Sequence, residues 1–200
     1  MNSLSPCRNV GRARLFFALF FAVVLVPSVA PAAFHLWTIR ELYTNASGSV
    51  QFIELFTGSS GQQFTNSQVI QVTEQATGMT HTFMFPSDTP NPTDNHAILI
   101  ATSNLQSLGG PAPDFPTLQA GFLFSGASTI EFLGTNQGAI SYPGLPTDGT
   151  HSLGIPGNTT QVNTPQNYAG TVGSVPEPVT WSLLGLGGLV ICFLLRRRAA

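Results

Sequence analysis

Between residues 33 and 156, hydrophobic and polar positions follow one another in short runs that are typical of β-strands. Val, Ile, Phe, Thr and Tyr dominate the runs, and Gly, Pro, Asn, Asp and Ser separate them. From Met79 to Phe85, alternate positions place apolar groups and one histidine on a single face. Such runs are at 36–43, 50–56, 69–73, 80–85, 97–101, 121–124, 129–133 and 139–142. Short strands separated by turns predict an all-β sandwich or barrel.

A different pattern, an unbroken apolar run, lies near the N-terminus. Three arginines precede the run at 15–26, and two small residues, Ala30 and Ala32, follow it. This order predicts a secretory signal peptide over 1–32, with cleavage by signal peptidase after Ala32. A retained membrane anchor would need a longer apolar run. The arginines are Arg8, Arg12 and Arg14.

A second unbroken apolar run lies close to the C-terminus, between a Pro-Glu-Pro triplet and an arginine cluster. It has seventeen uncharged residues, which at ~1.5 Å per residue span about 26 Å as a helix. We therefore predict a transmembrane helix. Because flanking basic residues stay on the cytoplasmic side, the chain before Pro176 is expected outside the cytoplasm. The three parts are Val175-Pro176-Glu177-Pro178, 179–195 and Arg196-Arg197-Arg198.

The tail over 175–200 resembles the PEP-CTERM sorting signal of bacterial proteins that exosortases process. The resemblance implies that a membrane protease cuts near the Pro-Glu-Pro triplet and releases or transfers the protein. The triplet would then be recognised by the protease and would have no catalytic role. The implied route is export through the inner membrane, transient anchoring through 179–195, and a final place at the cell surface or outside the cell. The alternative is an ordinary C-terminal membrane anchor that follows a rigid proline joint.

The body over 33–156 also carries a family resemblance. Segments 36–45 and 50–55 contain an Ile-x-Glu strand followed by a strand that ends in Ile-Glu-Leu. These segments resemble the opening hairpin of lamin-tail-like domains, and the segments 140–142, 148–153 and 164–167 resemble the closing strand and tail of that family. The resemblance implies an immunoglobulin-like β-sandwich.

Between this body and the sorting signal, residues 157–174 are almost all Gly, Asn, Thr, Gln, Ser, Pro or Val. Such a composition offers too little apolar area to offset the entropy lost on ordering. We therefore predict a flexible spacer over 157–174, which would hold the domain away from the cleavage site.

Charge and cysteine content narrow the function of the exported body. The chain has seven arginines and no lysine, and the body keeps only Arg40 against eight carboxylates. Nucleic-acid binding is not expected, because neutralising phosphates needs clustered basic residues. Both cysteines, Cys7 and Cys192, lie in the terminal segments. The body therefore has no disulfide, no thiolate zinc site and no cysteine nucleophile.

The residues of the body form no recognisable catalytic or metal-binding pattern, so we predict no catalytic and no metal site. Its histidines form neither a His-x-His nor a His-x-x-x-His pair, and no Gly-x-Ser-x-Gly elbow occurs. We expect no cofactor. The oxygen-rich loop 87–95 lacks EF-hand spacing, so calcium binding there is an open question. The histidines are His35, His81, His96 and His151.

Glu41 and Glu54 fall on adjacent predicted strands, which would suit a two-carboxylate glycoside hydrolase. Arg40 is available as an ion partner, which favours a structural interpretation of both glutamates. A secreted hydrolase is therefore the weaker alternative.

The sequence favours an exported, non-enzymatic protein with a structural or adhesive role at the cell surface or in extracellular polysaccharide. Its expected partners are signal peptidase and exosortase during processing, and the membrane through 179–195 before cleavage. The main alternative is a carbohydrate-binding module that uses surface aromatics such as Trp37, Tyr43 or Tyr142, of which Trp37 is better explained as a core residue.

Overall fold

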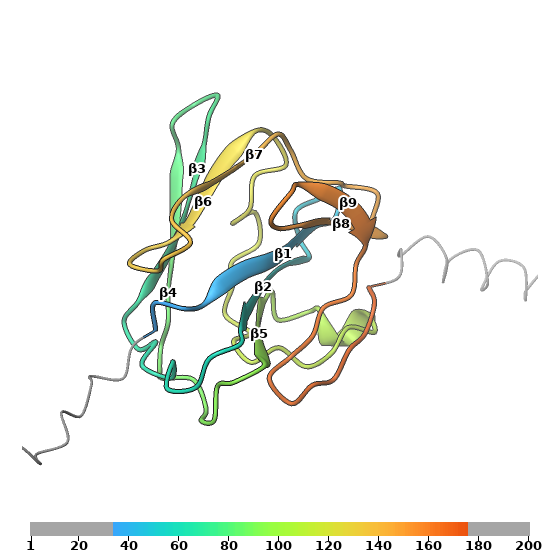
Figure 1. Ribbon diagram of the computed structural model, residues 1–200. Coiled ribbons are helices and arrows are strands. Elements are labelled where there is room, and N and C mark those ends of the chain that lie inside the picture. The colour runs from blue at the N-terminus through green and yellow to red at the C-terminus, as the bar shows by residue number, and fades with distance from the viewer. Residues whose placement is uncertain (1–33, 176–200) are drawn as a thin grey trace, which may run out of the picture. The chain divides into compact units, whose positions relative to one another are not determined.

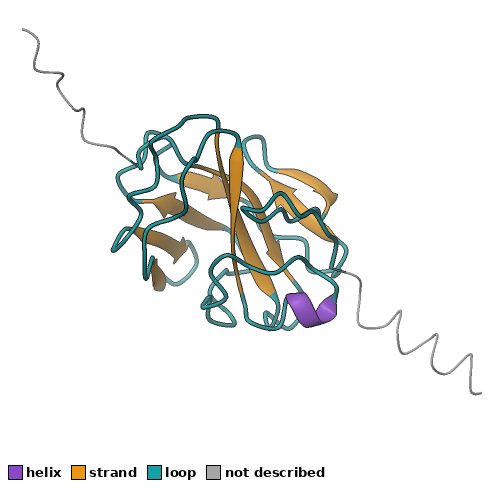
Figure 2. Ribbon diagram, turned by 90° about the horizontal axis from the view of Figure 1, so that it is seen from below, coloured by secondary structure: helices purple, strands orange, loops and turns teal. Residues whose placement is uncertain are grey.

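The computed structural model describes residues 34–175. The predicted signal peptide over 1–32 with Ala30 and Ala32, the segment 179–195, Pro176-Glu177-Pro178 and Arg196-Arg197-Arg198 all lie outside this range. Strands and loops make up nearly all of the described chain, with one short 3₁₀ helix (Figure 2). Among residues 34–175, no helix has the length and apolar character needed to span a membrane.

Within residues 34–175, nine strands form two antiparallel sheets (Figure 1). The five-stranded sheet has the order β5-β2-β1-β8-β9, and the four-stranded sheet has the order β4-β3-β6-β7. The elements are β1 (Thr38–Thr44), β2 (Gln51–Thr57), β3 (Val69–Glu74), β4 (Thr80–Met84), β5 (His96–Ala101), η1 (Gln106–Leu108), β6 (Ser128–Phe132), β7 (Ile140–Tyr142), β8 (His151–Gly154) and β9 (Thr159–Val162). The prediction of an all-β body is confirmed, and the two sheets are consistent with a sandwich.

The main hydrophobic core lies between the two sheets. Ile53 and Ile98 of the five-stranded sheet share one buried cluster with Ile70 and Phe132 of the four-stranded sheet. Aromatic rings fill the space between them, and the Phe85 ring lies 5.2 Å from the Phe132 ring, centroid to centroid. Alternate strand residues point to the same face, so the two-residue period of the sequence builds this core.

A β-bulge in β1 decides which side chains enter the core. Ile39 pairs with Leu55 and Glu41 pairs with Glu54, so Arg40 is an extra residue in the ladder. Without the bulge, strict alternation would turn Glu41 toward the core. The extra residue places Leu42 inside the core and leaves Arg40 and Glu41 on the outer face.

Seven of the eight predicted strands are present, with ends shifted by at most two residues. The predicted strand at 121–124 was wrong, although Leu123 is buried there. The backbone N–H and C=O of Leu123 bond to the side-chain amide of Gln51, at 3.0 and 2.8 Å, in place of a neighbouring strand. The apolar residues at 121–124 therefore lie in a loop that bonds to the Gln51 side chain, and they do not form a strand.

The structure also differs from the predicted spacer over 157–174 and from a body that ends at 156. This segment contains β9, which pairs with β8, and its continuation to Val175 lies on the five-stranded sheet. Hydrogen bonds between polar side chains and backbone groups bind most of it to the sheet, and Val175 adds one buried apolar contact. Composition alone could not reveal these contacts.

Candidate functional site

The chain after β9 returns across the outer face of the five-stranded sheet, and we call residues 163–175 the C-terminal strap. In Figure 1 it follows β9 in orange and red. Its first arm, residues 163–168, is extended, with the side chains of Asn163, Pro165 and Asn167 buried in alternation. The strap ends at Val175, the last described residue.

Three acidic side chains lie in line beneath the strap, and we call Glu41, Glu54 and Asp114 the carboxylate row. Glu41 of β1 is paired with Glu54 of β2, and Glu54 is paired with Leu99 of β5. Asp114 continues the row beyond β5, because its carboxylate accepts a 2.8 Å hydrogen bond from the Leu99 N–H. Side chains in register on neighbouring strands stand about 5 Å apart, so the row runs across the strands.

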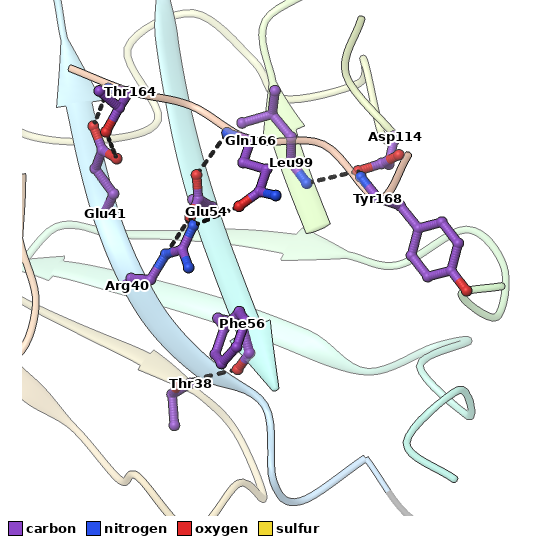
Figure 3. A network of polar contacts seen from close by, with 10 residues as sticks. All are labelled: Thr38, Arg40, Glu41, Glu54, Phe56, Leu99, Asp114, Thr164, Gln166 and Tyr168. Carbon is purple, nitrogen blue, oxygen red and sulfur yellow. Dashed lines mark hydrogen bonds and ion pairs between the residues drawn. The ribbon is translucent and has the colours of Figure 1, made fainter. Parts of the chain in front are cut away.

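The carboxylate row accepts hydrogen bonds from alternate backbone N–H groups of the strap (Figure 3). The distances are 3.0 Å from Thr164 N to Glu41, 2.7 Å from Gln166 N to Glu54, and 2.9 Å from Tyr168 N to Asp114. Successive N–H groups of an extended chain point in opposite directions. Every second N–H group of the first arm therefore donates to one side chain of the carboxylate row.

Glu54 is the centre of the carboxylate row and its side chain is completely buried. Burial raises its pKa to about 7, while the Arg40 guanidinium and the N–H of Gln166 act in the opposite direction. Arg40 forms an ion pair with Glu54, donates to the Gln166 side chain at 3.0 Å and lies over the Phe56 ring. The only arginine of the body thus joins the row to the strap.

Asp114 shows the same influence of burial at the end of the row. Burial raises its pKa, and the N–H groups of Leu99 and Tyr168, which bond to its carboxylate, oppose that increase. The ring of Tyr168 stacks on His96, with 4.4 Å between the ring centroids. The end of the first arm, at Tyr168, is therefore fixed by both polar and aromatic contacts.

The second arm of the strap folds back beside the first as an irregular hairpin. Asn167 N donates to Thr171 O at 3.1 Å, and Gly173 N donates to Pro165 O at 3.1 Å. At the open end, the Asn163 side chain replaces the next backbone pair. It accepts from Val175 N at 2.7 Å and donates to Val175 O at 3.2 Å.

Asn163 also fastens the strap to the sheet. Its side-chain amide donates to Thr150 O at 2.7 Å, and its backbone N–H donates to the same oxygen at 2.9 Å. Val175 is only 3 % exposed and packs in a second apolar cluster with Phe52 and Leu99. The outer face of the five-stranded sheet is therefore covered up to the last described residue.

The residues named for the alternative functions are buried in the structure. Glu41 and Glu54 are brought together as the sequence suggested, but both lie beneath the strap and bond to its backbone. Trp37 lies in the core, as the sequence favoured, whereas Tyr43 and Tyr142 were wrongly taken as surface aromatics, because each is only 1 % exposed. No ring face of these three residues is open to a sugar.

The remaining candidate residues are dispersed. The imidazole of His151 bonds to Asp148, and His81 contacts the backbone oxygen of Phe122. In the loop 87–95, Asp88 accepts a 2.9 Å hydrogen bond from Asn66 N. Within residues 34–175, no three His, Cys, Asp or Glu side chains are grouped as metal ligands would be.

Sequence reasoning did not find Asn163 and Asp114 as site residues. Asn163 lies in a polar stretch without hydrophobic alternation, and Asp114 lies in a proline-rich loop. Their partners are 12 and 54 residues away in the chain. No spacing rule in the sequence links residues across such separations.

A protein-family model for the PEP-CTERM protein-sorting motif matches residues 174–198. The match confirms the predicted sorting signal and spans Val175, Pro176, Glu177, Pro178 and the three arginines. It implies processing by an exosortase and export to the cell surface or the extracellular space. No curated protein and no solved structure matches the chain. The lamin-tail-like resemblance of the body stays a prediction.

Residues 174 and 175 belong both to the matched motif and to the described fold. Ser174 is exposed, whereas Val175 is buried and bonded to Asn163. The sorting motif of this chain therefore begins within the folded body, and its first residues are part of the strap.

Proposed function

We propose that this chain is an exported, non-catalytic surface or matrix protein with a structural or adhesive role. Signal peptidase would remove 1–32 and an exosortase would process the C-terminal tail. The tail would cross the membrane through 179–195 until that cleavage. The working part would be an immunoglobulin-like β-sandwich.

The observation that carries this proposal is the fold of the body up to the sorting motif. The two sheets enclose a dense apolar core, and the outer carboxylates hold the strap. Glu41 and Glu54 each accept a hydrogen bond from a backbone N–H of the strap, so a sugar and a water molecule would have to displace the strap to reach them. A stable, acidic body that sits directly before a sorting motif suits a role in surface structure.

The export route is tested by replacing Pro176, Glu177 and Pro178 with alanine in the full-length protein. Fractionation and immunoblotting should find the altered protein uncut in the inner membrane, while the wild type is shortened and outside. Normal shortening and release of the altered protein would contradict the route. The surface role is tested separately, by comparing cell adhesion and matrix retention between the wild-type strain and a deletion strain.

Carbohydrate binding is a second candidate, supported by a hollow beside β4. This hollow has a volume of about 390 Å³ and is lined by residues that include Thr80, His81, Thr82 and Gln119. Hydroxyl, imidazole and amide groups are suitable partners for sugar hydroxyls. Glycan-array binding that is lost in a Thr82→Ala, Gln119→Ala variant would favour this role, and no binding by the wild type would contradict it.

A further inference from the structure

The strap holds the chain as far as Val175, the residue that precedes the Pro-Glu-Pro triplet. We propose that the strap is a processing stop: it keeps the chain up to Val175 docked on the sheet, so the exosortase can cut only beyond Val175. Asn163 is the positioning residue that sets this boundary. The proposal rests on the exosortase route described above.

The first step concerns the backbone of Val175. A peptide that enters a protease in extended form offers its N–H and C=O groups to the enzyme. Both groups of Val175 are already bonded to the Asn163 side chain, at 2.7 and 3.2 Å. The enzyme would have to break both hydrogen bonds before it could bind this residue.

The second step concerns the rest of the strap. The N–H groups of Thr164, Gln166 and Tyr168 are held by the carboxylate row, and Gly173 is bonded to Pro165. Peeling back one residue therefore loosens a hairpin whose contacts support one another. The strap should open as a unit, and only a small fraction of molecules should be open at any time.

The third step is the close fit at the end of the strap. A side-chain carbon added at Gly173 would lie 2.9 Å from a Pro111 ring carbon and 3.3 Å from Gly109 O. Val175 then fills the apolar cluster beside Phe52 and Leu99. Because the backbone is in close contact on this side, no protease active site can surround residues 173–175 while the strap is docked.

The docked strap limits which peptide bond can be cut, and the exosortase carries out the cleavage itself. A nucleophile, either water or an acceptor group, bonds to the carbonyl carbon while the C–N bond breaks. The proton of the nucleophile goes to the new amino group of the membrane segment. The body keeps the acyl half of the cut bond. Its C-terminal residue therefore identifies the peptide bond that the exosortase cut.

The experiment compares full-length proteins in cells that contain the exosortase. The wild type is compared with Asn163→Asp, which keeps the oxygen that accepts from Val175 N but removes the donated bonds, and with Asn163→Ala. Asn136→Ala, at an exposed asparagine, is the matched control. Intact-mass spectrometry of the released body gives the C-terminal residue, and an exosortase-deficient strain shows which ends depend on that enzyme.

The wild type and Asn136→Ala should have ends only beyond Val175. Both Asn163 variants should gain ends within 164–175, because the strap should open at least about tenfold more often once two side-chain hydrogen bonds are lost in Asn163→Asp, or three in Asn163→Ala. These new ends should vanish without the exosortase.

Three outcomes would overturn the processing stop. They are a wild-type end at or before Val175, unchanged ends in both Asn163 variants, and new ends that persist without the exosortase. The first of these outcomes is measured on the wild type, so it would overturn the proposal even if neither Asn163 variant folds. A wild type that is never cut would instead refute the export route, so the two failures are distinguishable.

Discussion

The side chain of Asn163 pairs with both backbone polar groups of Val175, twelve residues further along the chain. The same amide donates to Thr150 O, so it joins the end of the fold to the segment that leads into β8. An asparagine side chain thus replaces a strand partner where the ladder has ended. The described fold therefore continues to the residue that precedes the Pro-Glu-Pro triplet.

Docking of the strap predicts slow hydrogen exchange at its alternate amides. The N–H groups of Thr164, Gln166 and Tyr168 should exchange at least about a hundredfold more slowly than an exposed amide, because exchange requires opening. Ala46, in the exposed turn between β1 and β2, is the reference. Amide-resolved NMR exchange of the released body measures the rates, and equal rates at Thr164 and Ala46 would mean that the strap is not docked.

Ionisation of Glu54 predicts that stability falls as the pH rises. Its pKa is raised from 4.5 to about 7 by folding, so the folded state holds a proton that the unfolded state has lost. The resulting stabilisation is fully present below pH 4.5 and is lost as the pH rises through about 7. The decrease attributable to Glu54 should be about 3 kcal/mol.

The change Glu54→Gln isolates this contribution. Glutamine cannot ionise, so the free energy of unfolding of the variant should improve relative to the wild type as the pH rises from 4.5 to 7. The NH2 group of glutamine cannot accept a hydrogen bond, so one bond made by the Glu54 carboxylate is lost. This loss lowers the free energy of unfolding by an amount that does not depend on pH. Urea denaturation at several pH values measures both, and a constant difference across the window would refute the raised pKa.

The charge of Arg40 should set the pH range over which ionisation of Glu54 lowers the stability. Removing its charge in Arg40→Met should raise the pKa of Glu54 further, so the loss of stability should extend above pH 7. At pH 8 the variant should be about 2 kcal/mol less stable than the wild type, and at pH 5 the difference should be smaller. The double variant Arg40→Met, Glu54→Gln is the control, and the pH dependence should disappear from it.

Burial of Val175 predicts a difference between two valines of one strap. Val175 is 3 % exposed, whereas Val172 is 58 % exposed. Val175→Ala should lower the unfolding free energy of the body by about 2 kcal/mol, because two buried methyl groups are lost. Val172→Ala should change the unfolding free energy by less than about 0.5 kcal/mol. Similar effects from the two changes would show that the strap does not cover the apolar cluster in solution.

The sorting signal and the β character of the body could both be predicted from the amino-acid sequence. Both depend on local order: three parts in succession at the C-terminus, and a two-residue period within each strand. Most strands were predicted for this reason. The pair of Glu41 and Glu54 was also foreseen, because adjacent strands bring their residues side by side.

The contacts of those residues, and the position at which the described fold ends, became known only from the three-dimensional structure. The bulge at Arg40 turns Glu41 outward, and the outer face then receives a polar segment that composition marked as a spacer. The bonds of Asn163, Glu54 and Asp114 link residues that are 12 to 112 positions apart. Local patterns carry no record of such contacts, because a buried hydrogen bond can bind a polar chain without any apolar period.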